Sequence, residues 1–142
     1  LEATAYKLFG VPGLICPIMD AKRNQVYTGL YRFEDEFAVV SDQEAMDMGE
    51  LIEKLNAMGE RVIFLGDGVP VYRKQIEEKL TVPFSFAPAN TNRQRGASVA
   101  ALGCRYFEQG KTESAAEHMP DYLRKSQAER EREERERAAE QG

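Results

Sequence analysis

The sequence predicts an α/β fold in which an antiparallel meander of three strands is followed by alternating helices and strands. Two observations predict it. Apolar, strand-like segments fill the first forty residues and are joined by turns too short for a parallel connection. From about Ser41 onward the apolar residues recur at helical spacing. The 142 residues are 42% hydrophobic and 30% charged, which is ordinary for one globular domain with one core.

The first forty residues are expected to contain the end of a helix and three strands. Leu1, Ala5 and Leu8 share one helix face, and Gly10 ends that segment. The following runs are rich in β-branched and aromatic residues, and the second is apolar on both faces. The predicted strands are Leu14–Met19, Val26–Phe33 and Phe37–Val40, separated by turns at 21–24 and 34–36.

A first long helix is predicted to begin at Ser41, because Ser41 and Glu44 have the spacing of a capping box. Gly59 is expected to end it. Its apolar face consists of Met48, Leu51, Ile52, Leu55 and Met58.

The rest of the body alternates strands with helices. Val62–Leu65 is a buried strand that ends in Gly66-Asp67-Gly68, and Pro70 opens a helix. A short strand is expected at 83–87 and a last helix at 96–109. In the helix that Pro70 opens, the inward residues are predicted to be Tyr72, Ile76 and Leu80. In the helix at 96–109 they are predicted to be Val99, Leu102, Gly103 and Tyr106. Ala97, Ala100, Ala101 and Cys104 are expected to allow the last helix to lie close to the sheet.

The resulting order, β-β-β-α-β-α-β-α, is the connectivity of the ribonuclease-H-like fold, which each half of the actin, sugar-kinase and Hsp70 superfamily uses. An α+β sandwich of another topology is the alternative.

Three carboxylates suggest an enzymatic hypothesis. Asp20 follows the first strand, Glu50 lies in the first long helix and Asp67 follows the fourth strand. Acids at these places hold divalent metals in ribonuclease-H-like nucleases. The alternative is that Asp20 and Asp67 are ordinary turn residues. A net charge of −5 gives no basic surface for a nucleic acid, so this chain is not expected to grip a nucleic acid directly.

The strand-to-helix loop of Gly66, Asp67 and Gly68 is a candidate contact for a nucleotide, since such loops can bring backbone N–H groups close to a phosphate. The same glycines are also explained by a tight turn. The loop at 89–95 carries Arg93 and Arg95 before a helix. It is compatible with contact to an anion or a partner, or with an ordinary solvated loop.

The cysteines and the single histidine give no metal site. Cys16 and Cys104 have no metal-ligand spacing and are expected to be buried thiols. His118 is expected in a surface turn, so neither zinc nor a Ser-His-Asp triad is predicted.

A change of composition divides the chain near Leu123. The segment 124–142 contains no core-forming residue and has i,i+4 charge pairs such as Glu131–Arg135, which favour a solvated helix without a coiled-coil seam. Its start, around Tyr122, Leu123 and Arg124, is a candidate contact with a partner.

Several strings resemble the TsaB (YeaZ) family of tRNA threonylcarbamoyladenosine biosynthesis proteins, older records of which read glycoprotease-like or peptidase M22. The resemblance spans nearly the whole chain in the family's order. The strings are MPDYLRKSQAERE at 119–131, LEATAY at 1–6, CPIMDAKRNQVYTGLY at 16–31, IFLGDGVPVY at 63–72 and ASVAALG at 97–103.

The resemblance implies two ribonuclease-H-like lobes, of which this chain has the second with its tail. Residues 1–10 would then end a helix of the absent N-terminal lobe, residues 11–123 would form the lobe, and 124–142 the tail. It further implies a cytoplasmic, non-catalytic subunit that supports TsaD, together with TsaE, in threonylcarbamoyl transfer to tRNA. ATP or ADP would act at the level of the complex, and the full-length protein could form a homodimer. A metal-dependent nuclease or an ATP-using phosphotransferase is the alternative.

Overall fold

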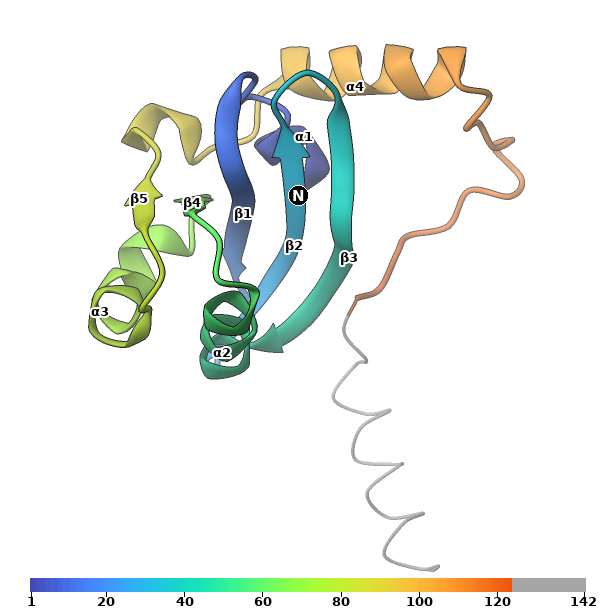
Figure 1. Ribbon diagram of the computed structural model, residues 1–142. Coiled ribbons are helices and arrows are strands. Elements are labelled where there is room, and N and C mark those ends of the chain that lie inside the picture. The colour runs from blue at the N-terminus through green and yellow to red at the C-terminus, as the bar shows by residue number, and fades with distance from the viewer. Residues whose placement is uncertain (124–142) are drawn as a thin grey trace, which may run out of the picture.

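The sheet has five strands in the order β3-β2-β1-β4-β5 (Figure 1). The computed structural model describes residues 1–123. The strands are β1 (Val11–Asp20), β2 (Gln25–Phe33), β3 (Phe37–Asp47), β4 (Val62–Leu65) and β5 (Phe84–Phe86). The helices are α1 (Glu2–Ala5), α2 (Met48–Met58), α3 (Val69–Lys79) and α4 (Gly96–Glu108), with a 3-10 turn η1 (Ala89–Thr91). The mixed α/β class predicted from the sequence is confirmed.

Strand directions follow from the lengths of the connections. β1 pairs with β2, and β2 with β3, in antiparallel register, as the short turns predicted. β1 and β4, and β4 and β5, are parallel pairs whose connections contain helices. The carboxyl ends of β1 and β4 therefore lie at the same edge of the sheet.

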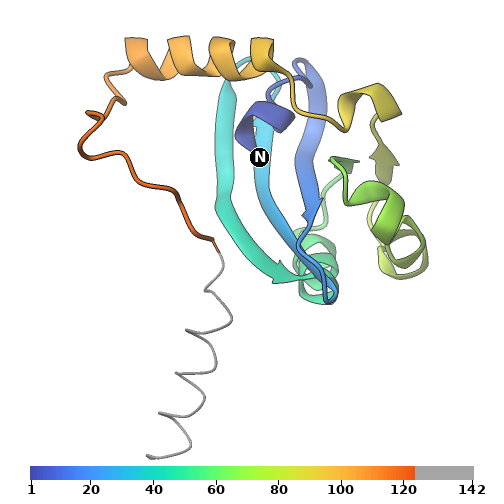
Figure 2. The same ribbon diagram turned by 180° about the vertical axis from the view of Figure 1, so that it is seen from behind.

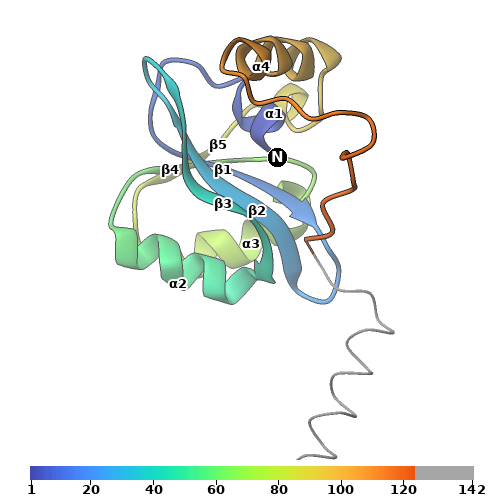
Figure 3. The same cartoon turned by 90° about the vertical axis from the view of Figure 1, so that its right-hand side faces the viewer.

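Helices cover both faces of the sheet. Figure 3 shows α2 and α3 on one face and α1 and α4 on the other. The α2/α3 face holds the larger core cluster, which includes Leu14, Leu55 and Phe64. The opposite face, seen in Figure 2, holds a smaller and largely aromatic cluster around Tyr31, Phe33 and Phe37.

β2 contributes to both clusters, as its apolar pattern predicted. Val26 and Leu30 face the larger cluster, whereas Tyr31 and Phe33 face the smaller one. The Tyr31 hydroxyl lies where a side chain on Gly29 would stand, and it has no hydrogen-bond partner within the part of the chain that the structure describes.

The predicted capping box at Ser41 and Glu44 is wrong. Both residues belong to β3, where Ser41 pairs with Leu30 and Glu44 with Thr28. Their side chains both bond to the Lys54 ammonium at 3.0 Å, and Asp47 caps α2 instead by accepting from the Gly49 N–H at 2.7 Å. Continued pairing with β2 satisfies the backbone of 41–47, so the local cap signal does not start a helix there.

The predicted inner face of α4 is only partly correct. Leu102 is buried and Tyr106 half-buried, but Val99 is 55% exposed and Gly103 has no atom within 4 Å of where its Cβ would lie. Ala97, Ala100, Ala101 and Cys104 are exposed as well. The prediction of two buried thiols therefore holds for Cys16 and is wrong for Cys104. The helix rests on α1 and the sheet by a narrow stripe, so most of its apolar surface stays open.

The central elements agree closely with the sequence patterns. α2 buries Met48, Leu51, Ile52 and Leu55 and ends at Gly59 with φ 70°, and β4 spans the predicted residues. Tyr72, Ile76 and Leu80 of the α3 segment are buried. β1 begins at Val11, earlier than predicted. Within residues 1–123, none of the helices combines the length and apolar character needed to cross a membrane.

Candidate functional site

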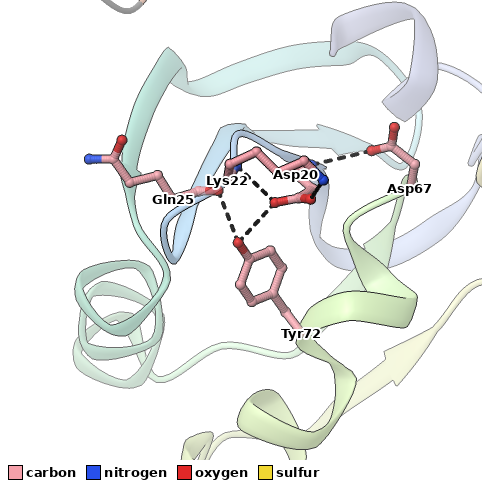
Figure 4. Close-up of polar contacts among 5 residues, drawn as sticks. All are labelled: Asp20, Lys22, Gln25, Asp67 and Tyr72. Atoms are coloured by element: carbon pink, nitrogen blue, oxygen red, sulfur yellow. Dashed lines mark hydrogen bonds and ion pairs between the residues drawn. The ribbon is translucent and has the colours of Figure 1, made fainter. Parts of the chain in front are cut away.

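The carboxyl edge of β1 and β4 brings two of the predicted acidic residues together. Asp20 ends β1, and Asp67 lies in the loop after β4. The Asp20 N–H donates to Asp67 Oδ1 at 3.4 Å (Figure 4). The parallel pairing of β1 with β4 produces this contact.

Asp20 is the centre of a polar cluster with Lys22 and Tyr72. Its Oδ1 accepts from the Lys22 N–H at 2.9 Å and from the Tyr72 hydroxyl at 3.1 Å, and its Oδ2 accepts from the Lys22 ammonium at 2.5 Å (Figure 4). The Lys22 hydrogen bonds hold the pKa of the Asp20 carboxyl below its usual value. Burial, and then the bond to Asp20, raise the pKa of the Tyr72 phenol. The cluster joins the β1–β2 turn to α3.

This cluster predicts a pH-dependent stability difference for Asp20→Asn. Because the pKa of Asp20 is lower in the folded state, its contribution is present above the unfolded value near 4 and is lost as pH falls through the folded pKa. At pH 7 the variant should be about 1–2 kcal/mol less stable than the parent protein. In urea denaturation curves this difference should shrink at pH values below 4. Asp35→Asn, which removes a carboxylate from an exposed turn, is the matched control, and an Asp20→Asn difference that is constant with pH would contradict the assignment.

The β1–β2 turn is held in an unusual backbone conformation. Lys22, Arg23 and Asn24 all have positive φ, of 64°, 55° and 59°. Non-glycine residues in this region cost about 1 kcal/mol or more each. The turn is stabilised by Asp20 at one end and at the other by Asp47, whose Oδ2 accepts from the Asn24 amide at 2.8 Å.

The third predicted carboxylate does not complete a metal site. Glu50 is exposed in the first turn of α2. Among residues 1–123 there is no group of three or more His, Cys, Asp or Glu side chains placed to hold a metal ion. Of the three acids in the metal-nuclease hypothesis, the structure brings Asp20 and Asp67 together and does not group Glu50 with them, and the hypothesis itself stays a prediction. His118, the other residue weighed for a metal, bonds to Glu113 at 2.6 Å on the surface.

Backbone packing requires glycine in the Gly66-Asp67-Gly68 loop. A Cβ on Gly66, whose φ is 108°, would overlap the Ile18 carbonyl oxygen, and one on Gly68 would lie 3.0 Å from it. The Gly66 N–H already donates to Asn92 Oδ1 at 3.1 Å, and the Gly68 N–H to Ile18 O at 3.0 Å. Two of the loop's amides are thus committed to the fold, and nucleotide contact at Gly66, Asp67 and Gly68 stays a prediction.

Two hollows flank Met19 on the α1 side of this edge. The first hollow has a volume of about 320 Å³, and the last three described residues, 121–123, form part of its lining. Its lining is Leu1, Met19, Tyr27, Gln43, Asp121, Tyr122 and Leu123. The second, about 390 Å³, combines α1, the loop after β4 and the loop before α4. Its lining is Thr4, Met19, Gly66, Asp67, Asn92, Arg93 and Gln94.

The start of the predicted partner-binding segment lies at the first hollow. The Gln43 amide donates to Asp121 Oδ2 at 2.8 Å, which ties this segment to β3. Tyr122 is 81% exposed and Leu123 is half-buried. Arg124, the predicted tail helix 124–142 and its charge pairs lie outside the described residues. An apolar aromatic side chain is therefore presented to solvent beside a hollow.

Sequence reasoning missed the residues that complete the second hollow. Thr4 and Asn92 come from segments far apart in the chain, and neither belongs to a recognisable motif. The only local signal was the pair of arginines near 93–95, which was compatible with an anion contact. Only the tertiary packing brings Thr4 and Asn92 to the same hollow.

Comparison with known proteins identifies a relative in sequence and one in structure. No family model matches the chain. The chain is 36% identical over 121 residues to the tRNA threonylcarbamoyladenosine biosynthesis protein TsaB of Bacillus subtilis (strain 168), covering 82% of this chain and 50% of that protein. It also matches the crystal structure of an uncharacterized Pseudomonas aeruginosa protein with similarity to the peptidase YeaZ. That match has a TM-score of 0.62 and 18% identity, and covers 87% of this chain and 55% of that one. The chain spans about half the length of these relatives.

Proposed function

Because the chain belongs to the TsaB family, we propose that it serves in tRNA threonylcarbamoyladenosine biosynthesis as a non-catalytic subunit that supports TsaD. The observation that carries the proposal is the 36% identity to the B. subtilis protein over 82% of this chain. The likeness to the P. aeruginosa structure supports the fold only, since identity there is 18%. The proposal concerns the whole protein, of which this chain corresponds to about half.

The side chains of the described region support a non-catalytic role. A peptidase or nuclease needs a nucleophile with its base, or a cluster of metal ligands. Cys16 is buried, and burial raises the pKa of its thiol to about 12, so it is a poor nucleophile. Within residues 1–123 the His118 ring bonds only to Glu113, which is exposed. These features favour a scaffold over an enzyme.

We further propose that residues 11–123 form a ribonuclease-H-like lobe, with residues 1–10 contributed by a preceding helix and 124–142 forming a charged tail. The strand order β3-β2-β1-β4-β5, with its antiparallel meander and parallel crossovers, supports the fold. α1 packs on the same aromatic cluster as β2, which supports a close association of residues 1–10 with this lobe.

The proposed contact with TsaD is the exposed segment that includes Tyr122 and Leu123 beside the first hollow. Aromatic side chains next to a hollow are common anchors in protein interfaces. TsaE and a second copy of the full-length protein are further proposed partners, with ATP or ADP acting at the level of the complex. The net charge of −5 argues against a direct grip on tRNA. A cytoplasmic location follows from the proposed role.

Association with TsaD tests this function. The chain, or a longer protein that contains it, should co-purify with TsaD of the same organism. Tyr122→Ala should weaken the complex about tenfold. Val71→Ala removes another exposed apolar side chain, on α3, and should have no effect. Failure to associate with TsaD with or without ATP would refute the function, whereas association insensitive to Tyr122→Ala would refute only the proposed surface.

A further inference from the structure

The second hollow has the features of a binding site that the proposed function does not use. It lies between α1, the ends of β1 and β4, and the loop that precedes α4. Its volume of about 390 Å³ is within the usual range for small-molecule sites. Met19 contributes the nonpolar side chain of the lining, and the remaining side chains are polar or charged.

Thr4 gives the hollow an unsatisfied hydrogen-bonding group. The residue is only 3% exposed, yet within residues 1–123 its hydroxyl has no hydrogen-bond partner. Its hydroxyl oxygen is not fully enclosed, unlike Tyr31 Oη, which is both enclosed and unpaired in that region. The hydroxyl oxygen is therefore accessible at the hollow that Thr4 lines. A hydroxyl that is accessible and has no protein partner is available to donate to a ligand.

Positive charge gathers at the same place without carboxylate partners. Arg93 lines the hollow, and its carbonyl oxygen accepts from the Lys7 ammonium at 2.7 Å. Arg95 donates to the Asn90 carbonyl at 3.1 Å. In the described part of the chain none of these three cations forms an ion pair. Burial first, and then the nearby Arg95, lower the pKa of Lys7.

Asn92 supplies a further donor in a fixed orientation. The Gly66 N–H can only donate, so the amide oxygen of Asn92 must face it at 3.1 Å. The Asn92 NH₂ group has no partner among residues 1–123 and can donate to a ligand. Gln94 adds another amide to the lining. Thr4, Asn92 and Arg93 together offer the hydroxyl, amide and guanidinium donors that bind phosphate oxygens. The one acid in the lining, Asp67, opposes them.

We propose that this hollow binds the phosphate group of a small molecule, with Arg93 as the charge partner and Thr4 and Asn92 as hydrogen-bond donors. The inference does not rest on the TsaB-family role. The hollow is larger than a free phosphate ion requires, so a phosphate ester fits it better. The Met19 side accommodates the nonpolar part of such a molecule.

Titration of the full chain by calorimetry, with inorganic phosphate and with AMP as probes, tests the site. Saturable binding is expected, with a dissociation constant for inorganic phosphate on the order of 1 mM. Tighter binding of AMP would assign the site to an ester, and equal binding would assign it to the free ion. Absence of saturable binding for both probes would overturn the proposal.

Four variants make the test specific. Arg93→Gln should weaken binding about tenfold, and Thr4→Val, which preserves the shape of the side chain, about fivefold. Asp67→Asn should strengthen binding, because it removes the opposing charge. Arg73→Gln, a cation on α3 that bonds to Glu77 and lies over Phe86, should have no effect. Thermal denaturation checks that each variant is folded. Equal weakening by Arg73→Gln and Arg93→Gln, or weakening by Asp67→Asn, would overturn the assignment.

Discussion

Replacing Gly66 with alanine is expected to lower the free energy of unfolding by about 3 kcal/mol. Two costs combine at this position. The φ of 108° belongs to a region that residues with a Cβ rarely adopt. The added methyl group would also overlap the Ile18 carbonyl oxygen, which is backbone of β1 and cannot rotate away. Urea denaturation followed by circular dichroism measures the loss.

Gly103→Ala is the matched control, since it adds the same methyl group where the structure leaves space. Gly103 lies inside α4, has ordinary helical geometry and has no atom within 4 Å of the Cβ position. Alanine should therefore stabilise the protein by about 0.5–1 kcal/mol through its better helix propensity. Opposite signs for the two substitutions are the expected result. A loss at Gly66 below about 1 kcal/mol would show that β1 and the loop separate easily, contrary to the packing described.

Elements whose local signals agree with their tertiary environment could be predicted from the sequence. In α2 the apolar period indicates a helix and Gly59 marks its end, and the structure agrees with both. The segment 41–47 could not be predicted, because its capping-box spacing competes with pairing to β2, and only the fold reveals that pairing. A local signal is decisive only when no long-range partner offers the same backbone groups a better bond.

The residues of the candidate site also fall into two groups, those that the sequence predicts and those that only the fold reveals. Asp20 and Asp67 were expected at strand ends, and parallel pairing of β1 with β4 brings them together. The Asn92 amide that bonds to the Gly66 loop, and Thr4 in the same hollow, had no signal in their own stretches of sequence. α4 shows the complementary difficulty. A helix that is apolar nearly all round does not indicate which of its faces is covered, so Val99 and Gly103 were assigned inward although both are exposed.

Phe64→Ala is expected to have the largest effect on stability of any substitution considered, a loss of about 4 kcal/mol. Phe64 lies in β4 between β1 and β5, is fully buried, and contacts Phe86 with ring centroids 6.1 Å apart. Truncation removes most of the side chain and leaves a cavity that the surrounding strands cannot fill. The midpoint of urea denaturation should fall while the slope of the transition stays constant.

Phe107→Ala makes the same chemical change on the open face of α4 and should alter stability by less than about 0.5 kcal/mol. Phe107 is 74% exposed, so its ring loses almost no burial on truncation. The pair of variants therefore separates burial from residue type. If Phe107→Ala were to destabilise the isolated chain by more than 1 kcal/mol, α4 would have to be covered in solution by a surface that this structure does not contain. Sedimentation measured over a range of concentrations would then show whether that surface is a second copy of the chain, because a contact between copies depends on concentration and one within the chain does not.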